Sequence, residues 1–399
     1  MPGAKTPTLE VNQGFAFATG IECSAPVIEG GVRMDELEKT GHYRHYEEDI
    51  RMVAELGIQF LRYGIPFHQV CARPGSFDWS FTDRAMEACQ RHGVVPIADL
   101  MHFGVPDHLG NFQNPRVAEV FADYALAFAE RFPWVRYYTL VNEPLVTARF
   151  SAQEGWWNER LASPAAFTRA MLNIGRCIVL AHQQVQARRP DAIYLQSESC
   201  EYWNPVHPDA VEPARFMNEL RFIGFELAYG RALPGVVADY LLHHGATKDE
   251  LRWFEHNGSD AGCIAGNDYY DVSEKEVHAD GRHKDAGERL GYYFLAKQYH
   301  ERLGVPIMHA ETNAEVNAVD WLQRQWTATM RLRDEGYPIR GFTWYGFVNH
   351  VDWDTALREN NGRENACGLV TLGRVPNATH KAYRAIIAAE AAAVTAPSR

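Results

Sequence analysis

Chemically active residue types cluster in one short stretch, YTLVNEPLVTARF, residues 138–150. Its apolar start is typical of a buried strand, but the run ends in Asn142, Glu143 and Pro144. Burying a carboxyl group costs free energy unless the group is paired or used, and proline interrupts a strand. We therefore expect a strand that presents Asn142 and Glu143 at its end, with Pro144 turning the chain away.

Several other predicted strands also have polar residues at or near their ends. Each polar residue alone could be explained by packing, but together they are difficult to explain in this way, because burial of unpaired polar groups is costly. We expect them to form one site with these members: Glu22, Arg62, His102, Asn142, Glu143, Glu198, Asn267, Tyr269, Glu311 and Trp344.

The elements that must position these residues alternate along the chain. β-rich runs occupy 14–21, 58–65, 94–101, 137–142, 192–197, 263–270, 305–311 and 339–346. Amphipathic, helix-like segments include 45–57, 82–93, 117–132, 165–189, 320–336 and 378–393. This order predicts an α/β protein, a single (β/α)8 TIM barrel spanning 1–399. A barrel of this kind typically has about 250 residues, so we expect extended βα loops.

A doubly wound sheet is the competing interpretation. It would need a glycine-rich phosphate loop after the first strand, and the segment FATGIECSAP does not have that pattern. In a barrel, the carboxyl ends of the strands form the active face. The fourth and seventh strands lie on opposite sides of that face, so Glu143 and Glu311 should face each other.

Two opposed carboxyl groups are the requirement for glycoside hydrolysis. One protonates the leaving oxygen, and the other attacks the anomeric carbon or activates water. A separation of about 5 Å between the two carboxyl groups would give retention of configuration, and roughly 6.5–9.5 Å would give inversion. We expect the shorter separation for Glu143 and Glu311.

The composition limits which binding partners and which cellular compartment we expect for this protein. The net charge of −12 disfavours nucleic acid and anionic membranes as partners, and no apolar run approaches the length of a membrane span. The amino-terminal segment lacks a secretory pattern, which predicts a cytoplasmic protein. Seven scattered cysteines show no metal-ligand spacing. We therefore expect no metal. The chemistry of the two carboxyl groups needs no cofactor and predicts a small carbohydrate or glycoside as ligand, and the sequence leaves the oligomeric state open.

The ordered motifs resemble glycoside hydrolase family 1, the β-glucosidase-like family of retaining (β/α)8 enzymes, in a divergent bacterial branch. TLVNEP resembles the acid/base motif T-x-N-E-P, and MHAETNAE resembles the nucleophile motif T-E-N-G. LMHFGVPDHL, FLRYGIPF and IAGNDYY resemble L-x-H-W-x-x-P-x-x-L, R-F-S-I-S-W and I-G-x-N-x-Y. FTWYGFVNHVDW resembles W-S-x-x-D-N-x-E-W, with a one-residue gap after the first tryptophan.

The resemblance implies a role for each matched residue. Glu143 would be the acid/base and Glu311 the nucleophile, with Arg62 beside it and the Tyr269 hydroxyl donating to its carboxylate. The other implied sugar contacts are His102, Asn142, Asn267, Tyr269, Trp344, Asp352 and Trp353. The family's first-strand motif Q-x-E-G is altered here, so Glu22 or Glu29 would take the place of its glutamine, and we favour Glu22.

The resemblance also implies a substrate class. Asp352 would accept hydrogen bonds from neutral 4- and 6-hydroxyls and repel a 6-phosphate, unless it only caps a turn. We therefore expect an exo-acting hydrolase of terminal unphosphorylated β-D-hexosides, either glucosides or galactosides. Two alternatives stay open: a transglycosidase that uses the same residues, and a sugar-binding barrel without turnover.

Overall fold

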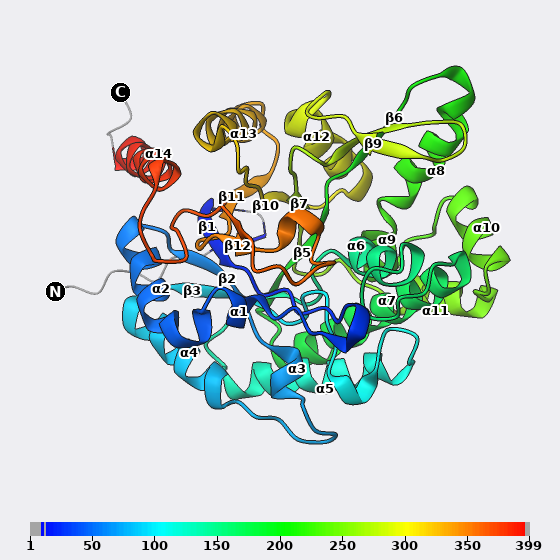
Figure 1. Ribbon diagram of the computed structural model, residues 1–399, viewed down its shortest axis with the longest axis horizontal. Helices are drawn as coiled ribbons and strands as arrows, with labels where there is room; N and C mark the ends of the chain where they lie inside the picture. Colours follow the sequence, from blue (N-terminus) through cyan, green and yellow to red (C-terminus); the bar gives the residue numbers. More distant parts are fainter. Residues whose placement is uncertain (1–8, 12, 396–399) are drawn as a thin grey trace.

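Eight parallel strands close into a barrel, as predicted (Figure 1). The computed structural model describes residues 9–11 and 13–395. The strands follow one another around the barrel in the order β1-β11-β10-β7-β5-β4-β3-β2. Their bounds are β1 Ala16–Ile21, β2 Phe60–Gly64, β3 Val95–Asp99, β4 Tyr137–Thr139, β5 Ile193–Ser199, β7 Cys263–Asp268, β10 Ile307–Glu311 and β11 Ile339–Tyr345. Each coincides with one of the predicted β-rich runs.

Helices surround the barrel (Figure 1), and their apolar faces pack against the strands or against one another. The six predicted helices correspond to α2 His42–Leu56, α4 Ser80–His92, α5 Arg116–Arg131, α7 Pro164–Arg188, α13 Ala318–Asp334 and α14 Ala378–Thr395. The remaining helices are α1 Glu36–Lys39, α3 Phe67–Val70, α6 Pro144–Ala148, α8 Val211–Leu220, α9 Ile223–Tyr229, α10 Gly235–His243, α11 Lys248–Asn257 and α12 Gly291–Leu303. No described helix combines the length and apolar character needed to cross a membrane.

Local sequence signals explain where several helices begin and end. The Ser163 side chain accepts a hydrogen bond from the backbone N–H of Ala166, and Pro164 occupies the first turn of α7. Thr247 and Glu250 form a reciprocal capping box at the start of α11. Gly57 ends α2 in the left-handed conformation that glycine adopts without strain.

The lower part of the barrel interior is a packed apolar core. Its buried side chains come from the barrel strands and the amino-terminal segment, and they are Leu9, Ala16, Ala18, Phe60, Ile97, Tyr137, Ile193, Leu195, Ile264, Met308 and Ala310. Because this layer fills the barrel, the space available for a ligand lies above it, at the carboxyl ends of the strands.

The extended βα loops carry small sheets that were not predicted. β6 Tyr202–Pro205, β8 Glu274–Val277 and β9 His283–Asp285 form a three-stranded sheet from the segments that follow β5 and β7. Figure 1 shows β6, β9 and α8 projecting together from the barrel. β12 His350–Val351 pairs with β13 Glu364–Asn365 after the last barrel strand. These loops supply much of the length beyond a minimal barrel.

Candidate active site

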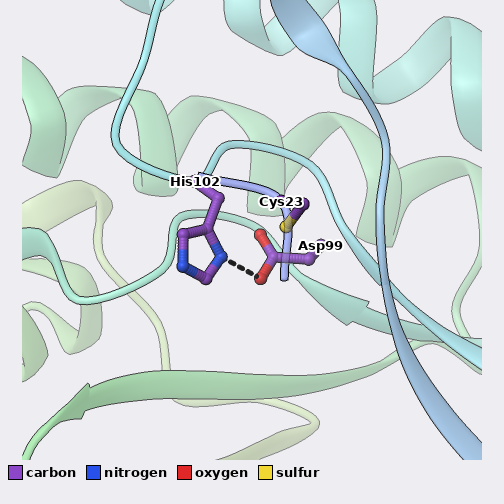
Figure 2. Close-up of side chains that lie close together, drawn as sticks. All are labelled: Cys23, Asp99 and His102. Atoms are coloured by element: carbon purple, nitrogen blue, oxygen red, sulfur yellow. Dashed lines mark hydrogen bonds and ion pairs between the residues drawn. The ribbon is translucent and has the colours of Figure 1, made fainter. Parts of the chain in front are cut away.

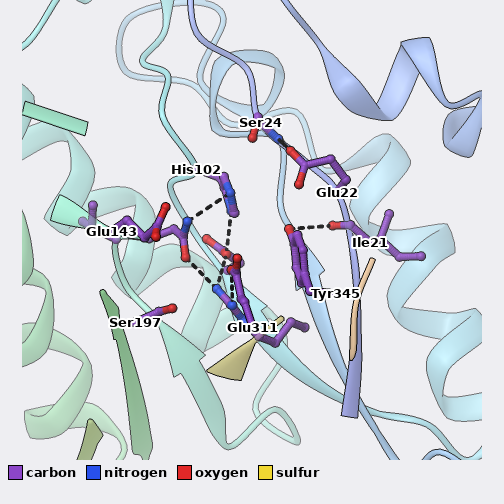
Figure 3. A network of polar contacts seen from close by, with 12 residues as sticks. Ile21, Glu22, Ser24, His102, Glu143, Ser197, Glu311 and Tyr345 are labelled. Atoms are coloured by element: carbon purple, nitrogen blue, oxygen red, sulfur yellow. Dashed lines mark hydrogen bonds and ion pairs between the residues drawn. The ribbon is translucent and has the colours of Figure 1, made fainter. Parts of the chain in front are cut away.

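A cavity of about 490 Å³ opens at the carboxyl ends of the barrel strands. Figure 3 shows the polar residues gathered at its base, with Glu143, His102, Glu22 and Tyr345 around Glu311. The other lining residues come from the end of β5 and from the segments that follow the barrel strands, and they are Phe103, Val146, Arg149, Phe150, Ser199, Glu201, Tyr270, Asp271, Val272, Ser273, Lys275, Asn313, Ala314, Glu315, Val316, His350, Trp353, Asn365 and Cys367.

Glu143 stands at the turn where the segment after β4 becomes α6. Its backbone has φ 39°, in the left-handed region, and its N–H donates to the Ser197 carbonyl at 3.1 Å. Pro144 occupies the first turn of α6 and redirects the chain, as the sequence predicts. A non-glycine residue in this conformation stores about 1–2 kcal/mol of strain, so the surrounding structure must hold Glu143 in place.

No described residue donates a hydrogen bond to the Glu143 carboxyl group. Its pKa lies well above the ordinary glutamate value. Burial is the largest cause, followed by the nearby carboxylates of Asp268, Glu311 and Glu198. Glu143 therefore carries a proton more readily than a solvent-exposed glutamate does.

Glu311, at the end of β10, has a different environment. The Arg62 guanidinium donates to its Oε1, and the Tyr270 hydroxyl donates to its Oε2 at 2.6 Å. Burial and Glu22 raise the pKa of Glu311 overall, although Arg62, His102 and Tyr270 act against that rise. The pKa of Glu143 is raised further, since no described donor or guanidinium contacts its carboxyl group, so Glu311 is the more readily ionised of the two.

The hydroxyl that contacts Glu311 belongs to Tyr270, and the expectation for Tyr269 was wrong. The Tyr269 hydroxyl donates to Glu274 Oε1 at 3.0 Å, and its ring stacks on Trp321. Tyr269 therefore lies on the helix side of the strand end. Neighbouring residues on an extended chain point to opposite sides, so a one-residue difference in register replaces one tyrosine with the other.

The same one-residue difference affects Asn267. It is fully buried and is not among the lining residues of the cavity, and neither polar atom of its side chain has a described hydrogen-bond partner. Asp268, the next residue, faces the barrel interior, where the Ser197 hydroxyl donates to its Oδ2. Asn267 is therefore not a cavity residue in this structure, contrary to expectation.

On β11, Tyr345 replaces Trp344 as the aromatic residue of the cavity. Trp344 is fully buried outside the cavity, and its indole N–H donates to the Cys367 carbonyl at 2.9 Å. The Tyr345 ring lines the cavity, with the Arg62 guanidinium carbon 5.4 Å from its centroid. Starting from Tyr345, the resemblance to W-S-x-x-D-N-x-E-W runs to Trp353 without a gap.

Asp352 does not contact the cavity, and the expectation that it binds sugar hydroxyls was wrong. Its carboxylate accepts hydrogen bonds from the Lys39 ammonium at 2.7 Å and from three backbone N–H groups. These N–H groups belong to Asn361, Gly362 and Arg363. The side chain is fully buried and caps the loop after β12, which is the alternative considered above, whereas the adjacent Trp353 does line the cavity.

His102 and Asn142 form a hydrogen-bonded chain with Arg62. The Asn142 Oδ1 accepts from Arg62 at 2.7 Å, and its Nδ2 donates to His102 Nε2 at 3.0 Å. His102 Nδ1 then donates to Asp99 Oδ2 at 2.9 Å. Asp99 also accepts from Arg62. This chain fixes the orientation of the His102 ring, and Asp99 is a member that the sequence motifs did not indicate.

Cys23 joins Asp99 and His102 at the edge of this chain (Figure 2). One potential ligand atom from each residue lies within 4.8 Å of the other two. Spacing along the chain could not reveal the group, because Asp99 ends β3 while Cys23 and His102 lie in the segments after β1 and β3. Asp99 Oδ2 and both ring nitrogens of His102 are already hydrogen-bonded within the chain described above, whereas Asp99 Oδ1 has no partner among the described residues.

Glu22 and Glu29 take different positions. Glu22 is buried at the cavity, and its Oε1 accepts from the Ser24 backbone N–H at 2.9 Å. Burial acts to raise the pKa of Glu22, but the imidazoles of His350 and His102 and the Ser24 hydrogen bonds lower it overall. Glu29 is exposed and lies outside the cavity. The preference for Glu22 therefore agrees with the structure.

Glu198 anchors the turn that carries Glu143. It is fully buried, and its carboxylate accepts the backbone N–H groups of Leu145 at 2.8 Å and Ser199 at 3.0 Å. Burial raises its pKa to about 8. Glu198 is not among the cavity-lining residues, so its contribution is to hold α6 against β5.

The chain is similar to known proteins in part of its sequence and in its fold. Residues 34–197 match the sequence model of glycosyl hydrolase family 1. The 6-phospho-beta-glucosidase AscB of Escherichia coli is 32% identical over 116 residues, which cover 27% of this chain and 24% of that protein. Beta-glucosidase A of Thermotoga maritima is 27% identical over 358 residues, 78% of each protein. The first two curated relatives, both 32% identical, are matched over only about a quarter of their own length.

A solved family 1 β-glucosidase from Thermotoga maritima has the same fold. The two structures superpose with a TM-score of 0.81 over 96% of this chain and 99% of that chain, at 18% identity. The superposition extends the likeness well beyond the matched segment, to nearly the whole barrel. The match to the model of glycosyl hydrolase family 1 is therefore confined to residues 34–197, and over the rest of the chain the superposition shows a common fold.

Proposed function

We propose that the protein is an exo-acting, retaining β-glycosidase that hydrolyses terminal unphosphorylated β-D-hexosides. Glu311 is the nucleophile and Glu143 is the acid/base. The observation that carries the proposal is the contrast between the two carboxyl groups. Glu311 is held by Arg62 and Tyr270, whereas Glu143 is buried among other carboxylates. A nucleophile must be ionised and a general acid must be protonated.

The reaction proceeds in two displacements. Glu311 attacks the anomeric carbon while Glu143 gives its proton to the departing oxygen. The negative charge of Glu311 disappears when the glycosyl ester forms, which removes one of the charges that raise the pKa of Glu143. Glu143 then accepts a proton from water, and the hydroxide releases the sugar with its original configuration.

The charges around the cavity support an unphosphorylated substrate, although Asp352 plays no part. The acidic lining residues are Glu22, Glu143, Glu201, Asp271, Glu311 and Glu315, and the lysine and arginine residues are Arg149 and Lys275. Arg149 pairs with Glu201, and Lys275 pairs with Asp285. A phosphate dianion would therefore enter a cavity without a lining lysine or arginine free to pair with it, and like-charge contacts cost several kcal/mol.

The roles of the two glutamates are tested by replacing each with alanine. Glu311→Ala should abolish turnover of every substrate, and Glu143→Ala should slow substrates with poor leaving groups most. Azide should restore some activity to both, giving the β-azide from Glu143→Ala and the α-azide from Glu311→Ala. Equal slowing of activated and unactivated substrates by Glu143→Ala, without azide rescue, would remove Glu143 from the acid/base role.

The substrate class is tested separately. We expect nitrophenyl β-glucoside or β-galactoside to be cleaved in preference to the corresponding 6-phosphate and to both α-anomers. The first-formed sugar should be the β-anomer by NMR. Preference for the 6-phosphate, as the name of the 6-phospho-beta-glucosidase of Escherichia coli indicates for that protein, would refute the charge argument while leaving the two-glutamate mechanism intact.

A further inference from the structure

Asp268 is a third carboxyl group at the catalytic pair, and the mechanism above does not use it. In the register that the structure shows, it occupies the position of the asparagine in the motif I-G-x-N-x-Y. On the basis of the proposed function, we propose that Asp268 is a positioning residue that keeps the acid/base Glu143 protonated. Three carboxyl groups would then set the pH range of activity.

The strands place Asp268 beside Glu311 and link it to Glu143 through Ser197. Asp268 and Glu311 are register partners across β7 and β10, where a shift in the pairing brings them together. On the other side, the Ser197 hydroxyl of β5 donates to Asp268 Oδ2. The carbonyl of the same Ser197 accepts the backbone N–H of Glu143 at 3.1 Å. One residue of β5 therefore holds Asp268 with its side chain and Glu143 with its backbone.

No described cation neutralises Asp268 directly. Its side chain is fully buried, and Oδ1 has no hydrogen-bond partner among the described residues. Arg62 is the nearby guanidinium, but its hydrogen bonds go to Glu311, Asp99, Asn142 and the Ala310 carbonyl. When Asp268 is ionised, its buried charge therefore has no direct cationic partner, and such a charge acts strongly on its neighbours because little solvent screens it.

The effect of that charge on Glu143 has a definite sign. A negative neighbour disfavours the ionised form of a carboxyl group and raises its pKa. After burial, Asp268 is the largest cause of the raised pKa of Glu143, ahead of Glu311. Burial and Glu311 also raise the pKa of Asp268, against Arg62 and the Ser197 hydrogen bond. The two groups therefore titrate together and do not have independent pKa values.

The other titratable groups around Asp268 and Glu143 come from every neighbouring element. They are Arg62 on β2, His102 after β3, Glu198 on β5, Cys200 after β5, Tyr270 after β7, Tyr292 on α12 and Glu311 on β10. Of these, Arg62 is the permanent cation, and it bonds to Glu311. Removing the Asp268 charge would leave the remaining groups in place.

The test is Asp268→Asn, which keeps the shape of the side chain and removes its charge. We expect the alkaline limb of the pH profile of kcat/KM for an aryl β-glycoside to move about one pH unit lower. Asp268→Glu restores a carboxyl group and should return the limb toward the wild-type position, even where its absolute rate is lower. If Asp268→Asn does not fold, Asp268→Ser removes the same charge with a smaller side chain.

Two outcomes would overturn the inference. One is an unmoved alkaline limb in a folded, charge-neutral variant. The other is an equal loss of rate in Asp268→Asn and Asp268→Glu at every pH, which would indicate a purely structural role. Glu143→Ala separates these results from a failure of the proposed function. If that variant keeps the wild-type alkaline limb, the acid/base assignment is wrong, whatever the Asp268 variants do.

Discussion

Tyr270→Phe removes one hydroxyl group, the donor to Glu311 Oε2 at 2.6 Å. A hydrogen bond to the ionised form of a carboxyl group lowers its pKa, so its loss should raise the pKa of Glu311. The hydroxyl acts alongside Arg62, which stays in place. The variant therefore tests a single contact and leaves the main counter-charge untouched.

The size of the effect follows from the type of bond. A hydrogen bond to a charged group contributes about 1.5–3 kcal/mol, and one pKa unit corresponds to about 1.36 kcal/mol. The pKa of Glu311 should therefore rise by about one to two units. The nucleophile must be ionised, so the acid limb of the kcat/KM profile should move to higher pH by the same amount. Activity should fall at low pH and recover as the pH increases.

Tyr269→Phe is the matched control. The Tyr269 hydroxyl donates to Glu274, whose carboxylate also accepts backbone N–H groups of Arg289, Leu290 and Gly291. This variant should lose about 0.5–1.5 kcal/mol of stability and leave the acid limb unmoved. Full pH profiles of both variants with one aryl β-glycoside show which tyrosine hydroxyl contacts Glu311. A shifted limb in Tyr269→Phe and a wild-type limb in Tyr270→Phe would refute the register described above.

Three further variants test other parts of the structure. Asp352→Ala removes the acceptor of three backbone N–H groups. It should therefore lower the melting temperature and reduce the hydrolysis of hexosides and of xylosides equally. A loss confined to hexosides would show that Asp352 does contact the sugar. Arg374→Met removes one of the two partners of the buried Asp49 carboxylate, which keeps His42, and should cost about 1.5–3 kcal/mol in urea unfolding; an unchanged free energy of unfolding would contradict this. In Gly20→Ala, the new Cβ would lie 2.1 Å from Tyr345 Cε2 and would displace that ring. We expect kcat/KM to fall by about 100-fold. Wild-type kinetics would show that the Tyr345 ring does not position the substrate.

Sequence patterns were sufficient for the architecture and for the placement of Glu143 and Glu311 at one cavity. Eight β-rich runs alternating with amphipathic segments predicted the barrel, because strand and helix periodicities differ and glycine ends several helices. Glu143 could be identified because a carboxyl group and a proline follow an apolar run directly. The small sheets of β6, β8, β9, β12 and β13 were missed, since short strands in long loops have no apolar face of their own to reveal them.

Only the tertiary structure decided which of two adjacent residues faces the cavity. Parallel barrel strands are buried on both sides, so their sequences lack the apolar–polar alternation that would reveal the inward face. A shift of one residue therefore went undetected. It exchanges Tyr269 for Tyr270 and Trp344 for Tyr345 at the cavity, and Asn267 for Asp268 on the side that faces the barrel interior.

The contacts of the Asp352 side chain also depend on distant parts of the chain. Its carboxylate is occupied by Lys39, more than 300 residues earlier, and by the backbone of 361–363. Local sequence indicates that an aspartate is present, but its hydrogen-bond partners are chosen by how remote segments pack. Residue types and strand ends thus determined the chemistry available to this protein, and packing between segments determined which side chains take part.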